Sequence, residues 1–302
     1  MDKETALYAV MLSELPRVGD RLADRILGRN RERGHGLATF FRLPAAILRD
    51  VYRLPAETVA HLDAGVDAHR ARCGWLLGRL AGAGGDAWCI GDPAYPARLG
   101  RRLAPPAPVL YAVGAADVFQ RPTLAVLNSR LLAEHTVPAT TAVAQAAAGQ
   151  GFTLVGGGMK TSYRIASVAG RVAGAPRVIV LDRGLFTTFG AQADRDPSGF
   201  GPGRGPLDVA RTLVVSPFRL GDHASPRSGQ RRDELVAALA DVIVAVHAEP
   251  GGQIERVCLE ALDRGQVVLS WYGENAGLVA AGATAIAEAD LAELGRFASA
   301  SG

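Results

Sequence analysis

The sequence predicts an α/β protein: a doubly wound, mostly parallel, Rossmann-like sheet preceded by a small all-helical domain. Apolar residues recur at helical spacing through about the first eighty residues, and from residue 123 onward short β-branched runs alternate with helical patterns. A Pro-rich stretch separates the two patterns. Strands that alternate with helices at this interval are typical of βαβ units, which form parallel sheets.

The N-terminal part, residues 1–85, is expected to form a helical domain of the SAM or helix-hairpin-helix kind. Leu22 and Ile26 are spaced as on one helix face, as are Phe40, Leu43 and Ile47. The same segment contains a short turn pattern, residues 15–19, that resembles a helix-hairpin-helix turn. Such a turn can offer backbone N–H groups to a phosphate, or it can be purely structural, and both readings stay open.

Residues 86–120 are expected to form a Pro-rich connector that packs on the Rossmann domain, residues 121–287. The tail that follows, residues 288–302, is short, so we expect no C-terminal winged helix. The interval 186–211 is rich in Gly and Pro and predicts a mobile surface loop. Strands are expected at 109–113, 123–127, 152–155, 178–181, 212–216, 242–246 and 267–270, and a helix from about residue 231.

The bulk composition excludes several classes of protein. The 33 Lys and Arg residues nearly balance the 30 Asp and Glu residues, so any basic site is a local patch. Cys73, Cys89 and Cys258 are too far apart for a zinc or disulfide motif, and no other metal or cofactor pattern is found. No run of eighteen apolar residues is present, so we expect a cytoplasmic protein without a membrane span.

Four strand-to-helix loops are candidates for phosphate binding. In a parallel sheet, ligands bind at the carboxyl ends of strands, where helix N-termini favour anions. Small residues there permit close backbone approach, and cations neutralise phosphates. The candidate phosphate-binding residues are Ser129, Arg130, Gly157, Gly158, Lys160, Arg231, Arg232, Gly251 and Gly252.

Catalytic patterns are weak in this sequence, which favours a binding protein over an enzyme. No Ser/His/Asp order, paired-carboxylate spacing or metalloprotease motif is present. His247 and Glu249, near one loop tip, form the one plausible acid/base pair. In an alternative interpretation, Glu255 serves as acid/base and Arg231 or Arg232 holds a phosphate.

Several segments, in this order, resemble the DNA-processing protein A (DprA/Smf) family over most of the chain. The most specific segments are the connector sequences GDPAYPARL and PPAPVLYAVG, followed by RPTLAV and RRDELVAALAD. The resemblance implies a Rossmann-type protein that binds single-stranded DNA, loads RecA during natural transformation or recombination, and forms a homodimer.

The resemblance also has departures at the candidate loops. The family's Gly-Ser-Arg turn falls on residues 128–130, where Asn128 replaces the glycine. In the glycine-Arg loop Lys160 stands where Arg is expected, and Tyr163 where Asp is expected; the second glycine is Thr161. At the Arg-Arg-Asn-Arg helix start, the last two residues have become Asp233 and Glu234.

Two other functions stay open. The Pro-Gly-Gly turn at residues 250–252 resembles that of phosphoribohydrolase-like enzymes, which share a related Rossmann core and cleave nucleoside monophosphates. Alternatively, the acidic pair Asp233-Glu234 is compatible with a degenerate scaffold that has lost ligand binding and pairs with a partner, for example in a defence or recombination locus.

Overall fold

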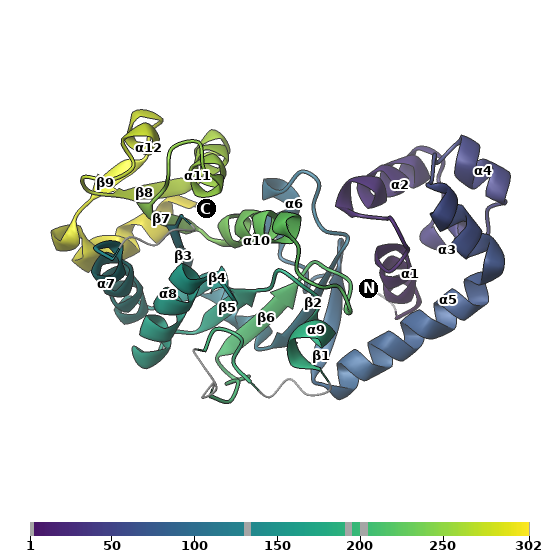
Figure 1. Cartoon of the computed structure of the whole chain (residues 1–302), viewed down its shortest axis with the longest axis horizontal. Coiled ribbons are helices and arrows are strands. Elements are labelled where there is room, and N and C mark those ends of the chain that lie inside the picture. The colour runs from purple at the N-terminus through teal and green to yellow at the C-terminus, as the bar shows by residue number, and fades with distance from the viewer. Residues whose placement is uncertain (1–2, 130–133, 191–194, 200–204, 302) are drawn as a thin grey trace. The chain divides into compact units, whose positions relative to one another are not determined.

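The computed structural model describes residues 3–129, 134–190, 195–199 and 205–301 (Figure 1). The chain divides into two compact units. The first comprises Met1–Ala112 together with Pro217–Leu220, and the second comprises Val113–Ser216 together with Gly221–Gly302. No helix in the described part of the chain is long and apolar enough to cross a membrane.

The first unit is built mainly from helices, as the apolar spacing predicts. On α2, the residues buried against the rest of the unit are Ala23, Ile26 and Asn30, which lie three to four positions apart on one face. The elements are α1 (Lys3–Ser13), α2 (Asp20–Glu32), α3 (Leu37–Phe40), α4 (Ala45–Asp50), α5 (Ala56–Gly82), β1 (Gly85–Cys89), α6 (Ala97–Arg102) and β2 (Val109–Gly114), whose last two residues belong to the second unit.

The turn between α1 and α2 has the backbone expected of a helix-hairpin-helix turn. Arg17 adopts a left-handed φ of 59°, a conformation that favours glycine, and Gly19 precedes the first residue of α2. The Arg17 side chain donates to Glu57 at 2.7 Å, and Thr58 Oγ1 donates to the Pro16 carbonyl at 2.8 Å. Both contacts anchor the turn to the start of α5, which supports a structural role.

A buried histidine links α1 to α5. His69 Nε2 lies 2.9 Å from the Met11 carbonyl, and its Nδ1 lies 3.1 Å from His61 Nε2. The carbonyl only accepts, so His69 donates from Nε2, and in the neutral ring its Nδ1 then accepts from His61 Nε2. Burial lowers the pKa of His69, and the nearby His61 lowers it further.

We therefore expect the protein to lose stability below pH 6.5. The unfolded chain protonates His69 near its ordinary pKa of 6.5, whereas the folded protein resists protonation until a lower pH. Stability is unaffected above pH 6.5 and falls by up to about 1.4 kcal/mol per pH unit below it. Urea unfolding between pH 7.5 and 5 measures this. His69→Gln should flatten the profile, while the same change at the exposed His223 should leave it unaltered.

The second unit contains the parallel sheet that the alternating pattern predicts. Seven strands of its described part lie in the order β6-β5-β4-β3-β7-β8-β9, and all six neighbouring pairs among them are parallel. They are β3 (Thr123–Asn128), β4 (Thr153–Gly157), β5 (Arg177–Val180), β6 (Thr212–Ser216), β7 (Val242–His247), β8 (Val267–Trp271) and β9 (Thr284–Ile286). The expected strands lie within two residues of these bounds, while β1 and β9 were not predicted.

Helices cover this sheet on both faces. The helices α7 (Thr136–Gly149) and α8 (Thr161–Val172) bury apolar residues against alternate positions of the strands, such as Leu124 and Val126. The helices α10 (Pro226–Leu239) and α11 (Gln253–Asp263) pack together on the sheet as well (Figure 1). Shorter helices are η1 (Ala116–Gln120), α9 (Leu185–Phe189), α12 (Ala276–Ala280) and the 3₁₀ segment η2 (Glu288–Ser301).

Two segments differ from the sequence-based expectation. The helix expected from residue 231 begins at Pro226, because Ser225 and Ser228 form a reciprocal capping box ahead of it. The tail is a packed element: Leu291 and Leu294 are buried in the core beside α7.

The described part of the interval 186–211 is also more ordered than a surface loop. Asp196 and Ser198 are buried, and Asp196 forms an ion pair with the buried Arg177 at 2.8 Å. Ser198 Oγ accepts from Arg177 and donates to Asp196. The prediction of a mobile loop was therefore wrong for these residues, because their polar groups are satisfied by Arg177, whereas residues 191–194 and 200–204 lie outside the described part.

Candidate functional site

Three of the candidate loops meet at the carboxyl edge of the sheet. The strand β3 lies between β4 and β7 in the sheet. The chain continues from β3 to β4 on one side of β3, and β7 pairs with its other side. Ser129 Oγ accepts from the Glu249 N–H at 2.7 Å, and Lys160 Nζ donates to the Asn128 carbonyl at 2.6 Å. This is the topological switch point, where open α/β sheets bind their ligands.

Lys160 is a candidate cation whose hydrogen-bond partner, the Asn128 carbonyl, is uncharged. Its side chain is half-buried at the entry to α8, and burial lowers its pKa to about 8, with Arg232 acting in the same direction and Asp233 opposing it. Its ammonium lies 5.2 Å from the centre of the Tyr163 ring. Among the described residues it forms no ion pair with a carboxylate, so its charge is open to an anion.

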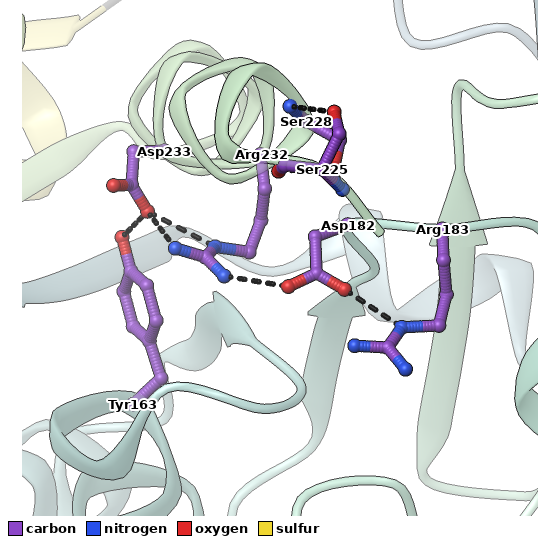
Figure 2. Close-up of polar contacts among 7 residues, drawn as sticks. All are labelled: Tyr163, Asp182, Arg183, Ser225, Ser228, Arg232 and Asp233. Carbon is purple, nitrogen blue, oxygen red and sulfur yellow. Dashed lines mark hydrogen bonds and ion pairs between the residues drawn. The ribbon is translucent and has the colours of Figure 1, made fainter. Parts of the chain in front are cut away.

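Arg232, by contrast, is neutralised inside the protein. Its guanidinium donates to Asp182 Oδ2 at 3.0 Å and to Asp233 Oδ1 at 2.9 Å, and its side chain is only 8% exposed (Figure 2). Burial alone would lower the pKa of Arg232, but Asp233 raises it above the ordinary value. The residue is a permanent cation between two carboxylates, which is typical of a structural ion pair.

Tyr163 completes this buried cluster. Its hydroxyl donates to Asp233 Oδ1 at 2.9 Å (Figure 2), and burial together with Asp233 raises its pKa well above the ordinary value. The Arg232 guanidinium lies 5.5 Å from the ring centre. Two of the positions that depart from the family pattern, Tyr163 and Asp233, are therefore direct partners.

Gly157 and Gly158 serve packing in this structure. A Cβ on Gly157 would lie 2.6 Å from Arg232 Cδ and 2.7 Å from the Tyr163 ring, and one on Gly158 would lie 3.1 Å from Leu181. Real Cβ atoms essentially never approach so closely as at Gly157. The glycine makes room for Tyr163 and Arg232, and this role needs no ligand.

The backbone N–H groups of the Pro-Gly-Gly turn, residues 250–252, already donate to acceptors close by in the chain. The Gly251 N–H donates to Glu255 Oε2 at 2.6 Å, and the Gly252 N–H donates to the Glu249 carbonyl at 2.9 Å. Gly251 has a φ of +72°, which favours glycine. The carboxylate of Glu255 therefore occupies the place at the start of α11 where an anion would bind.

The remaining candidates lie apart from this cluster or outside the described residues. Arg231 is half-buried on α10 and pairs with Glu234 at 3.3 Å, while Glu234 also pairs with Arg256 of α11 at 3.2 Å. Arg130, which follows Ser129, lies outside the described residues. The structure thus brings Ser129, Lys160 and the Pro-Gly-Gly turn together and places Arg231 in a separate network.

The histidine candidate, His247, lies beside Glu274. His247 Nδ1 lies 2.8 Å from Glu274 Oε2, and His135 Nε2 lies 3.1 Å from the other oxygen of Glu274. The hydrogen bond from His247 lowers the pKa of Glu274. Glu249 is exposed, and its backbone N–H donates to Ser129 Oγ, so Glu274 and not Glu249 is the carboxylate that lies beside His247.

Two carboxylates of this edge, Asp182 and Glu274, were missed in the sequence. Asp182 lies just beyond β5, and Glu274 follows β8 by three residues. The strand-end rule that selected the other loops applies to both positions, so this signal would have found them.

Comparison with known proteins places the chain in a family. The X-ray structure of DNA processing protein A from Streptococcus pneumoniae matches with a TM-score of 0.72 at 19% identity, covering 97% of this chain and 99% of that one. A Helicobacter pylori structure, described as giving insights into the single-stranded DNA binding mode of DNA processing protein A, matches with a TM-score of 0.50 at 19% identity. It covers 63% of this chain and 87% of its own.

These structural matches show the fold. No curated protein sequence matches this one significantly. The family model for DNA recombination-mediator protein A matches residues 86–294, which include the connector, the parallel sheet and every candidate loop. The chain therefore belongs to the DNA recombination-mediator protein A family.

Proposed function

We propose that this protein binds single-stranded DNA through its backbone phosphates, at the edge where Ser129 and Lys160 meet. The observation that carries the proposal is the half-buried ammonium of Lys160, which is held by a neutral carbonyl 2.6 Å away. A phosphate there gains a charge-assisted contact without displacing a carboxylate. A member of the same family is described as binding single-stranded DNA, which supports this ligand.

The binding mode differs from the one that the sequence alone suggests. Arg232 is paired with Asp182 and Asp233, so it orders the site without touching phosphate. Backbone contacts through few cations give weak sequence preference and an affinity that falls with salt. Retardation of a labelled oligonucleotide at increasing salt concentration tests this.

Lys160 makes the affinity depend on pH in a defined direction. A bound phosphate favours the ammonium, so binding takes up a proton wherever the free amine, with its pKa of about 8, is neutral. Affinity should be constant below pH 7 and fall above pH 8 by up to about tenfold per pH unit. Fluorescence anisotropy of labelled oligo-dT at fixed ionic strength measures it.

Two variants control this experiment. Lys160→Arg keeps the cation but does not titrate, so affinity should become independent of pH in this range. Lys160→Met should weaken binding at pH 7 and reduce the salt slope by about one. An unchanged affinity and salt slope for Lys160→Met would refute the proposed site.

The wider role follows from family membership. We propose that the protein acts in the cytoplasm in DNA processing, in uptake for transformation or in recombination, that it loads RecA onto the strand it binds, and that it works as a homodimer. Light scattering measures the oligomeric state. RecA filament assembly on DNA coated with this protein tests the loading step.

The contacts favour binding over nucleotide hydrolysis. A phosphoribohydrolase-like mechanism would need Arg231 or Arg232 for phosphate and Glu255 as acid/base. Arg232 pairs with two carboxylates, Arg231 pairs with Glu234, and Glu255 accepts from the Gly251 N–H at 2.6 Å. Release of free base from nucleoside monophosphates would contradict this assignment.

A further inference from the structure

An exposed tryptophan lies on the second half of α5, in the first unit. Trp75 is 61% exposed, although tryptophan is usually well buried. The other two tryptophans are covered to a greater degree: Trp88 is buried and Trp271 is half-buried. The exposed indole of Trp75 on this face of α5 is therefore a candidate contact for a ligand.

The surroundings of Trp75 are cationic. Arg72 and Arg79 lie three residues before and four residues after it, which places both beside it on the helix surface, and both are exposed. The Arg79 guanidinium lies over the indole at 5.5 Å from the ring centre. Residues 68–85 contain no Asp or Glu.

Small residues leave the ring accessible. The neighbours of Trp75 on its other flank are Ala71 and Gly78, and Gly74 precedes it. A Cβ on Gly74 or Gly78 would meet nothing within 4 Å, so packing requires neither glycine, although both weaken a helix. A planar group can thus approach the indole closely from this side.

We infer that Trp75, Arg72 and Arg79 form a second contact site for single-stranded DNA, in which a base stacks on the indole and the arginines bind the flanking phosphates. An aromatic ring between cations is the usual combination in sequence-tolerant single-strand binding, because every base has a stacking face and every linkage a charge. This inference rests on the proposed function but uses a site separate from Lys160.

The test is oligo-dT binding by the full chain with three variants. Trp75→Leu should weaken binding about tenfold or more, the effect usual for losing a stacked base, whereas Trp75→Phe should keep most of the affinity. Val172→Ala is the control, because Val172 is 77% exposed but is the last residue of α8, at the end of that helix away from Lys160, and should not contribute. DNA should quench tryptophan fluorescence in the wild type and much less in Trp75→Phe.

The outcomes separate this inference from the proposed function. If Lys160→Met weakens binding and Trp75→Leu does not, the second site is refuted and the proposed function stands. If Trp75→Leu weakens binding and Lys160→Met does not, the second site is supported and the switch-point site is refuted. If Trp75→Leu changes only the oligomeric state, Trp75 is a protein contact and the inference fails.

Discussion

Replacing Arg232 with Met is expected to destabilise the protein by about 3 to 5 kcal/mol. The guanidinium is the shared partner of Asp182 and Asp233, and Asp233 in turn accepts from the buried Tyr163 hydroxyl. Without Arg232, the largely buried Asp233 loses its counter-charge, and Asp182 keeps only its ion pair with Arg183 at 2.9 Å (Figure 2). Urea unfolding followed by circular dichroism at pH 7 measures the loss.

A second arginine on the neighbouring helix is the control for this prediction. Arg256 forms ion pairs with Glu234 and Glu260, but its side chain is 49% exposed. Arg256→Met should therefore cost less than about 1 kcal/mol. Equal losses in the two variants would show that Arg232 has no special structural role, and would return it to the set of phosphate-binding candidates.

Replacing Arg177 with Met should have an effect of similar size, about 3 to 5 kcal/mol. Arg177 and Asp196 are 3% and 1% exposed and lie 2.8 Å apart, and Arg177 also donates to Ser167 and Thr212. In the wild type, burial raises the pKa of Asp196, but Arg177 and the hydrogen bonds from Ser198 together lower it below the ordinary value. The variant leaves that carboxylate buried and unpaired.

The pH dependence of stability should differ between the wild type and the Arg177→Met variant. In the wild type, Asp196 has a lowered pKa, so its contribution to stability is lost as the pH falls below the ordinary value of 3.8. In the variant, only the two hydrogen bonds from Ser198 oppose burial, so the pKa of Asp196 should be higher than in the wild type and acidification should cost the variant less stability. Arg177→Met combined with Asp196→Leu should recover most of the loss at pH 7, because no buried charge remains. A double variant as unstable as the single one would contradict this.

The sequence predicts the sheet well because its central strands are buried on both faces. Runs such as those in β5 and β7 are almost entirely β-branched or apolar, and their bounds agree with the expectation within two residues. The edge strand β9 has only three residues, two of them exposed, and β1 begins with Gly85 and Asp86. Short, mixed runs like these carry no periodic signal.

The candidate site is harder to predict, because its partners are far apart in sequence. Strand ends identify Ser129 and Lys160 correctly as neighbours, since parallel strands end at one edge. The pairing of Arg232 with Asp182 spans fifty residues and depends on side-chain direction. Position in the motif therefore suggested a phosphate ligand, and the three-dimensional structure shows an internal salt bridge.

The family departures gain a physical meaning from the same contacts. In the family pattern, Asp stands at the position of Tyr163 and Asn at that of Asp233. Here Tyr163 donates to Asp233 at 2.9 Å, and Asp233 forms an ion pair with Arg232 at 2.9 Å. The two departures are therefore direct partners in one buried cluster of this chain.

The Glu255 carboxylate, bound to the Gly251 N–H, has a consequence for ligand choice. Because Glu255 is part of the chain, its carboxylate is present at the start of α11 at a high local concentration and competes there with anions from solution. A simple anion such as chloride or free phosphate must displace it there and gains little from the exchange. We expect a polyanionic strand to bind through its other charges without displacing Glu255. This edge should therefore bind a polyanion better than it binds a single small anion.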